Sequence, residues 1–235
     1  MKKRIWELDA LRGICILAMV VVHLVFDLVY IYGVLTLEGF GQRSFMLLTQ
    51  WGGIVFLLIS GISVTLGSHP VRRGLTVFGC GMLCSLVTAL MAWLGFLDPG
   101  IMIYFGVLHC LGVCMLLWPL LKKCPLWVLA VLGVTLAALG FYLQTLRVDV
   151  PWLIPFGVMY PGFASSDYFP LFPNLGFFLL GAFLGRLLYP HKQSLWPKVN
   201  EKNPVIWLLA ICGKWSLFIY LLHQPLITVA LELIF

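Results

Sequence analysis

Residues 9–23 read DALRGICILAMVVVH, and this stretch decides the fold class of the chain. Asp9 and Arg12 stand before a run of ten residues without charge, and the run ends at His23. Mostly apolar residues, interrupted by Asp27, then continue to position 34, which gives the roughly 20 residues that a helix needs to cross a bilayer. The stretch therefore predicts a membrane-spanning helix with charged groups at its beginning and a titratable histidine ring within its span.

The composition of the whole chain agrees with this prediction. Of its 235 residues, 62% are hydrophobic and 10% are charged, whereas about a quarter of the residues in a soluble domain are charged. The chain has too few polar residues to cover a water-facing surface, which excludes water-soluble enzymes and nucleic-acid-binding proteins. We predict an all-α, polytopic membrane helix bundle that forms a single transmembrane domain over residues 1–235.

About seven stretches are long and apolar enough to span a membrane. They are residues 12–34, 45–67, 74–97, 101–120, 125–145, 172–189 and 205–235. The last stretch is long for one span. We expect Gly213 and Lys214 to separate a short interfacial piece from a spanning helix that begins near Trp215.

The basic residues predict the orientation of these spans. Thirteen of the fifteen lie before or inside the first span and in alternate loops, and only Arg43 and Arg147 lie on the other side. The thirteen are Lys2, Lys3, Arg4, Arg12, Arg72, Arg73, Lys122, Lys123, Arg186, Lys192, Lys198, Lys202 and Lys214. By the positive-inside rule the N-terminus is cytoplasmic and the C-terminus lies outside. The net charge of +6 is thus a topology signal.

Three histidines come to a similar depth from three different spans. His23 lies eleven residues past Arg12, about 16 Å further along a helix, near the middle of a core about 30 Å thick. His109 lies eight residues into the fourth span from its outer end, and His223 lies eight residues past Trp215. We therefore expect one shared polar cavity. The alternative for each ring is a hydrogen bond to a neighbouring helix.

Acidic and aromatic side chains extend this candidate site toward the outer surface. Asp27 lies one turn after His23, where it could orient the ring as the acid of a catalytic triad does; the alternative is a hydrated carboxylate near the surface. Asp167 and Tyr168 end the outer connection 146–171. They are candidates for binding acceptor hydroxyl groups, or else they form a turn and an interfacial aromatic.

Four cysteines form i, i+4 pairs on the third and fourth spans. They are Cys80, Cys84, Cys110 and Cys114. Thiolates in such an array could hold a metal, but cysteine also behaves as a small, buried hydrophobic residue. We expect packing and no metal.

The spacing of Arg12, ten residues and His23 resembles the Arg-x10-His motif in the first helix of bacterial O-acyltransferases, within a wider transmembrane acyltransferase superfamily. The context is more similar to the heparan-alpha-glucosaminide N-acetyltransferase catalytic-domain family. Its bacterial members open with a segment like ELDALRGICILAMVVVH (7–23). Similar segments follow in order: VFLLISG (55–61), GVLHCLG (106–112), DYFPLFPNLGFFLLGAFLG (167–185) and SLFIYLLHQP (216–225).

The resemblance implies an acyltransferase that moves an acyl group, normally acetyl from cytoplasmic acetyl-CoA, to a sugar amine or hydroxyl on the far side. The lysosomal animal enzyme has Asn where this chain has His23, and it has a functional His in its first luminal loop. The segment 33–43 of this chain contains no His. A covalent acetyl-histidine in that loop is therefore not carried over, and heparan is not assumed as the acceptor.

Physical chemistry assigns roles to the residues of the motif. Arg12, with Asp9 beside it, is the candidate for the CoA head group, because a guanidinium can pair with phosphate bidentately. The roughly 16 Å from Arg12 to His23 are comparable with the pantetheine arm, and His23 could take the acceptor's proton. In the alternative, Arg12 pairs with Asp9 and holds the helix end. Candidate donors to the oxyanion are His109, His223 and Gln224.

The expected partners are acyl-CoA, a glycan or glycolipid acceptor and membrane lipid, with a homodimer as a further option and no nucleic acid. The expected location is the bacterial cytoplasmic (inner) membrane. A second hypothesis is a proton-coupled transporter of small molecules or lipids that relays protons through its histidines; the inverted repeats common in transporters are not found. A third is a sensor whose histidines report pH, which leaves the spacing of Arg12 and His23 unexplained.

Overall fold

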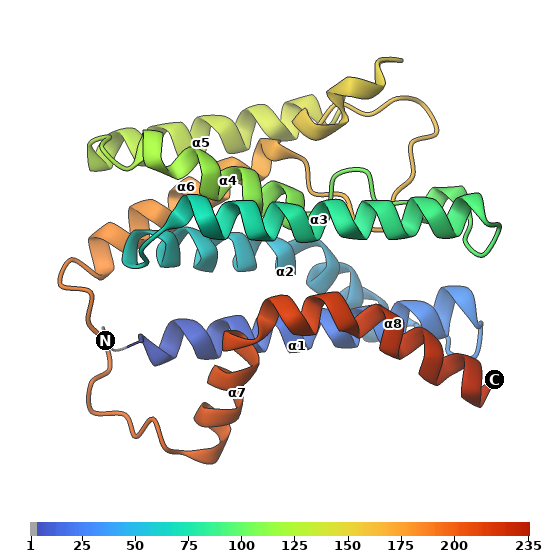
Figure 1. Cartoon of the computed structure of the whole chain (residues 1–235), viewed down its shortest axis with the longest axis horizontal. Coiled ribbons are helices and arrows are strands. Elements are labelled where there is room, and N and C mark those ends of the chain that lie inside the picture. Colours follow the sequence, from blue (N-terminus) through green and yellow to red (C-terminus); the bar gives the residue numbers. More distant parts are fainter. Residues whose placement is uncertain (1–3) are drawn as a thin grey trace. The chain divides into compact units, whose positions relative to one another are not determined.

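The computed structural model describes residues 4–235, apart from the side chains at positions 40 and 50 (Figure 1). Lys2 and Lys3, which contribute to the predicted orientation, lie outside the described residues. The elements are α1 (Trp6–Phe26), the π-turn η1 (Asp27–Ile31), α2 (Gly39–Leu66), α3 (Pro70–Trp93), η2 (Pro99–Ile101), α4 (Val107–Leu121), α5 (Leu126–Leu143), η3 (Pro151–Phe156), α6 (Leu171–Leu188), α7 (Pro204–Lys214) and α8 (Ser216–Ile234). The predicted all-helical, polytopic membrane bundle is confirmed.

Within residues 4–235, six helices are long and apolar enough to cross a membrane: α1 with η1, α2, α3, α5, α6 and α8. The boundary of the predicted fourth span is wrong at its outer end, because α4 begins at Val107 and has 15 residues. Residues 102–106 are irregular, and Phe105 and Gly106 are buried. Such backbone is tolerated at membrane depth where protein surrounds it.

The predicted division of the last apolar stretch is confirmed. α7 ends at Lys214 and α8 begins at Ser216, with Trp215 between them outside both helices. In Figure 1, α7 runs across the direction of α1, whereas α8 runs alongside α1. This arrangement fits an interfacial α7 and a spanning α8.

The chain divides into two compact units, Met1–Ile59 with His191–Phe235 and Ser60–Pro190. The expectation of a single domain stays a prediction. In the first unit, α1 and α7 approach closely through two glycines. A Cβ on Gly13 would overlap the carbonyl group of Leu209, and a Cβ on Gly213 would overlap that of Asp9. Only glycine permits this contact of the two backbones.

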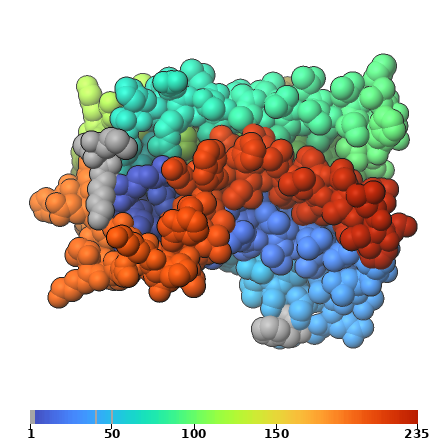
Figure 2. All heavy atoms as spheres, turned by 60° about the horizontal axis from the view of Figure 1, so that its bottom comes forward, coloured from blue at the N-terminus to red at the C-terminus, as the bar shows by residue number. Residues whose placement is uncertain are grey.

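Contacts between α1 and α8 show that these two helices run in the same direction. His23 meets His223, Asp27 meets Gln224, and Tyr32 beyond η1 meets Glu232, so positions rise together on both helices. In the space-filling view, α7 and α8 (orange to red) cover much of α1 (dark blue) on the face shown (Figure 2). The candidate site of this unit therefore lies along α1.

In the second unit, α3 packs on α4 and α5 packs on α6, again through glycines. A Cβ on Gly112 of α4 would lie 2.6 Å from the Cβ of Phe78 of α3, and one on Gly176 of α6 would lie 2.5 Å from the backbone of Ala137 of α5. Gly185 of α6 also approaches the backbone of Ile62 near the end of α2. Small residues let membrane helices approach closely and pack by van der Waals contact.

Candidate functional site

The rings of His23 and His223 meet where α8 lies against α1. Their centroids are 4.8 Å apart and the ring planes are inclined by 71°. His223 is buried and His23 is half-buried. The structure therefore brings two of the three predicted intramembrane histidines into direct contact.

The hydrogen bonds of these rings define their tautomers. Nδ1 of His23 lies 2.9 Å from the carbonyl oxygen of Met19, and Nδ1 of His223 lies 2.5 Å from that of Tyr220. A carbonyl oxygen can only accept, so each Nδ1 carries the hydrogen and each neutral ring keeps a lone pair on Nε2. Nε2 of His223 is buried, and no described residue gives it a hydrogen bond. Both rings thus have the form of a proton acceptor.

Asp27 lies at the start of the π-turn, where it is 3% exposed. Its Oδ2 accepts a hydrogen bond of 2.8 Å from Nε2 of Gln224. This burial argues against the hydrated alternative. The hydrogen bond of Asp27 runs to α8, while the His23 ring is held by Met19, so orientation of His23 by Asp27 remains a prediction.

A cluster of charged groups marks the other end of α1. Asp9 accepts hydrogen bonds from Nε and Nη2 of Arg4, at 2.8 and 2.9 Å, and from Nη1 of Arg12, at 3.3 Å. The side chain of Arg4 is 58% exposed, whereas those of Arg12 and Asp9 are 14% and 10% exposed. The pairing of Arg12 with Asp9 that the alternative reading expected is thus present.

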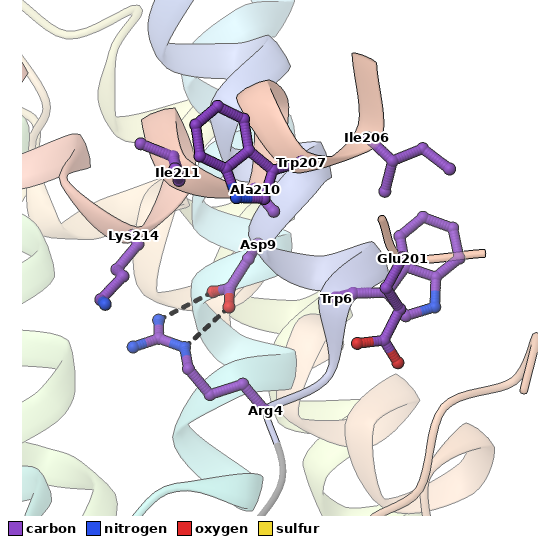
Figure 3. Close-up of a pocket in the computed structure, with 9 residues that line it drawn as sticks. All are labelled: Arg4, Trp6, Asp9, Glu201, Ile206, Trp207, Ala210, Ile211 and Lys214. Carbon is purple, nitrogen blue, oxygen red and sulfur yellow. Dashed lines mark hydrogen bonds and ion pairs between the residues drawn. The ribbon is translucent and has the colours of Figure 1, made fainter. Parts of the chain in front are cut away.

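Beside this cluster lies a pocket of about 240 Å³ (Figure 3). It is lined by Arg4, Trp6, Asp9, Glu201, Ile206, Trp207, Ala210, Ile211 and Lys214. The Nε1 of Trp6 is buried, and no described residue accepts its hydrogen. The pocket offers two indole rings, which can stack on an aromatic ring of a ligand, and two cations beside two carboxylates, with Arg4 paired to Asp9. Sequence reasoning missed this pocket as a whole, although it named two of the lining residues, Asp9 beside the candidate head-group site and Lys214 at the break between α7 and α8.

His109 lies in the second unit, where both of its ring nitrogens are engaged. Nδ1 accepts from the backbone N–H of Gly106 at 3.2 Å, and Nε2 lies 3.3 Å from Oγ of Ser85. Ser85 donates its own hydrogen to the carbonyl oxygen of Ile103 at 2.6 Å, so its oxygen is free to accept from Nε2 of His109. These bonds connect the beginning of α4 to α3, which favours a structural role for His109.

Asp167 and Tyr168 also make structural contacts within the second unit. Both carboxylate oxygens of Asp167 accept from the N–H of Val107, at 3.2 and 3.1 Å, and this caps α4. The hydroxyl of Tyr168 donates to the carbonyl oxygen of Ile154 at 2.8 Å. Burial raises the pKa of Tyr168 to about 12, so the phenol remains a donor at neutral pH. Convergence of His109 with His23 and His223 stays a prediction.

Half of the cysteine array belongs to the packed core, while Cys80 and Cys84 are half-buried. Cys110 and Cys114 are fully buried, and the seven cysteines are free thiols. Within residues 4–235, no group of three His, Cys, Asp or Glu side chains is arranged to hold a metal ion.

Comparison with known proteins adds one finding. A family described as "Heparan-alpha-glucosaminide N-acetyltransferase, catalytic" matches residues 4–225. No curated protein and no solved structure matches the chain. The matched range begins at the charged cluster of α1 and ends just after His223 and Gln224.

Proposed function

Because the chain belongs to the heparan-alpha-glucosaminide N-acetyltransferase catalytic-domain family, we propose that it is a membrane-embedded acyltransferase that uses cytoplasmic acetyl-CoA. The acceptor is an amine or hydroxyl of a glycan or glycolipid. The observation that carries this proposal is the pair of His23 and His223, each with its hydrogen on Nδ1 and a lone pair on Nε2. This is the form that a general base requires.

In the proposed reaction, His23 acts on the proton of the acceptor. The acceptor nitrogen or oxygen attacks the carbonyl carbon of the thioester and forms the new C–N or C–O bond, while Nε2 of His23 takes the proton. The C–S bond then breaks, and the leaving thiolate takes the proton back from His23 to give CoA with a free thiol. The base is thereby regenerated, and no redox partner is needed.

The tetrahedral intermediate needs a hydrogen-bond donor for its oxyanion. Two of the predicted donors already use their ring N–H in a hydrogen bond to another group of the protein. The N–H of His223 points to Tyr220, and the bonds of His109 direct its N–H to Ser85. The geometry therefore supports His223 as a partner of His23 better than as an oxyanion donor.

The donor end of the proposed site lies about 16 Å from His23 along α1. Arg12 bonds Asp9 through Nη1, and we propose that its guanidinium also pairs with a phosphate of the donor. Arg4 and Lys214 supply further positive charge at the adjacent pocket. We propose that the CoA head group binds at this end, with its pantetheine arm extended toward His23.

The remaining expectations belong to this proposal. Asp167 and Tyr168 are proposed acceptor contacts, although their present hydrogen bonds run to the beginning of α4 and to η3. The chain is an integral membrane protein; the bacterial inner membrane and the homodimer remain proposals. The proton-coupled transporter stays the second candidate, because a buried histidine pair could also relay protons.

Purified protein incubated with labelled acetyl-CoA and a panel of amino sugars and glycolipids tests the proposal. His23→Ala should lower transfer by about 10²–10⁴-fold with little change in CoA binding. Arg12→Ala should weaken CoA binding, and Arg12→Lys should restore it only in part, because lysine lacks the bidentate fork. His191→Ala is the matched control, since His191 is exposed on a loop. Full transfer by His23→Ala would exclude this mechanism, and proton flux in liposomes without acetyl transfer would favour the transporter.

A further inference from the structure

Two polar residues next to the two histidines, the buried Asp27 and the half-buried Gln224, have no assigned step in the proposed reaction. Nε2 of Gln224 donates to Oδ2 of Asp27 at 2.8 Å. Gln224 directly follows His223 on α8, and Asp27 lies one turn after His23 at the end of α1. The carboxylate–amide bond and the ring contact therefore join the same two helices at neighbouring positions.

The hydrogen bonds of the two rings do not connect the helices. The ring of His23 bonds Met19 of its own helix, and the ring of His223 bonds Tyr220 of its own helix. These bonds define how each ring lies on its helix, but they leave free the rotation and the sliding of α8 against α1. Whether the two rings meet depends on that register.

The bond between Asp27 and Gln224 crosses between the helices and is able to set the register. Asp27 is 3% exposed, and a buried carboxylate that loses its hydrogen-bond donor pays its full desolvation cost. Sliding or rotating α8 would break this bond. Oε1 of Gln224 is also buried, with no hydrogen-bond partner in the described part of the chain, so the amide is held through its nitrogen alone.

The local backbone supports the same view. η1 follows α1 directly, and the N–H of Tyr32 bonds the carbonyl oxygen of Asp27 at 2.9 Å, five residues back. Single π-turns of this kind occur often at functional sites. Asp27 is thus the first residue of the segment in which the α-helical hydrogen bonding of α1 changes to that of a π-turn.

We propose that Gln224 is a positioning residue, whose hydrogen bond to Asp27 holds α8 in the register that keeps His223 against His23. This inference rests on the proposed function, because it assigns Gln224 a role in the same reaction. Asp27 then acts through Gln224 on the histidine pair as a whole. The role differs from a direct contact of Asp27 with the His23 ring.

The first test replaces Gln224 by methionine, which keeps the length of the side chain and removes the amide. A displacement of reacting groups by about 1 Å can cost about 10²-fold in rate, so we expect kcat for acetyl transfer to fall by about 10²-fold. KM for acetyl-CoA should remain unchanged, because Arg12 lies about 16 Å from His23 along α1. A merely structural defect would not separate kcat from KM in this way.

Tyr32→Phe is the matched control. The hydroxyl of Tyr32 donates to Oε1 of Glu232 at 3.1 Å in an exposed position, so this variant also removes a hydrogen bond to α8. Tyr32 lies farther along the chain from the histidine of its helix than Gln224 does from His223, and we expect Tyr32→Phe to keep the wild-type kcat. Equal losses of kcat in Tyr32→Phe and Gln224→Met would overturn the specific role of Gln224.

The second test exchanges the two groups in the variant Asp27→Asn with Gln224→Glu. The exchange restores an amide–carboxylate bond in the opposite direction, whereas each single substitution weakens it. We expect the double variant to recover at least about tenfold in kcat over the slower single variant, which corresponds to about 1.4 kcal/mol. The exchange variant also tests the proposal if Gln224→Met does not fold, because it preserves the volume of both side chains and the hydrogen bond between them.

The outcomes separate the two proposals. Wild-type protein that transfers no acetyl group would refute the proposed function itself. Active wild type together with a fully active Gln224→Met would refute only the positioning role. A folded exchange variant that stays as slow as the single variants would also refute it. Because glutamate has no N–H, that last result would point to direct donation by Gln224 to the substrate.

Discussion

Replacing Gly13 by alanine tests the close contact of α1 and α7, which adjoins the proposed donor end of the site. The added Cβ would lie 2.8 Å from the carbonyl carbon of Leu209, closer still to its oxygen, and 3.2 Å from the nitrogen of Gly213. Ordinary contact begins at 3.4 Å, so the two helices must separate by at least about 0.6 Å at the carbonyl carbon. Backbone atoms cannot rotate away as a side chain can.

We expect this substitution to reduce the free energy of unfolding. Overpacking costs about 3 kcal/mol at the upper end of its usual range, and the better helix propensity of alanine offsets about 1 kcal/mol. The net loss is then about 2 kcal/mol. Because α7 carries Lys214 and lines the pocket, CoA affinity should fall as well, while His23 keeps its place on α1.

The measurement is unfolding of purified protein in mixed micelles with increasing SDS, followed by tryptophan fluorescence. Gly79→Ala on α3 is the matched control, since no described atom lies within 4 Å of the added Cβ. It should leave stability unchanged or raise it by up to about 1 kcal/mol. Unfolding of Gly13→Ala at the same SDS fraction as Gly79→Ala would refute the close approach of the two backbones.

Further predictions concern topology, core, charge cluster and tautomer. A topology reporter fused after Phe235 should read as extracytoplasmic, and a cytoplasmic signal there would contradict the predicted orientation. Cys110 and Cys114, both 0% exposed, should resist a membrane-permeant maleimide until the protein is unfolded in SDS. Asp9→Asn should cost about 1–3 kcal/mol of unfolding free energy in the same SDS titration, because it weakens the hydrogen bonds that this largely buried carboxylate accepts from Arg4 and Arg12. Nitrogen NMR of protein labelled on its histidine rings should show the Nδ1–H form for the signal that His23→Ala removes.

The spanning helices could be predicted because a membrane helix is defined mainly by the length and hydropathy of one continuous segment. The beginning of α4 could not be predicted in this way. Residues 102–106 are as apolar as a span, but Asp167 caps the helix at Val107 from sixty positions later in the chain. A further contact runs from the N–H of Phe169 to the carbonyl oxygen of Phe105. Hydropathy carries no information about such distant caps.

The depth of the candidate site in the membrane could be predicted from the sequence, but the contacts between its side chains could not. Counting 1.5 Å per residue is enough to bring His23 and His223 to one level. Which groups bond each other depends on the rotation of each helix about its axis, and this is why the partner of Asp27 proved to be Gln224. The pocket beside Asp9 could not be predicted, because it depends on α7 running across the direction of α1. That course depends on a glycine contact, which hydropathy does not reveal.

The directions of α1 and α8 decide whether the short helix α4 counts as a membrane crossing. Since α1 and α8 run parallel, a chain that enters α1 from one side of the membrane leaves α8 on the other. This requires an odd number of crossings, whereas the described part of the chain has six long apolar helices. If each of those six crosses once, α4 must be the remaining crossing, with its 15 helical residues completed by the irregular residues 102–106. The hydrogen bonds of His109 and Asp167 at this junction satisfy backbone N–H groups that lipid could not. We therefore expect loss of these two side chains to impair insertion or folding of α4 before it alters chemistry, and an Asp167→Ala variant that folds normally would contradict this account.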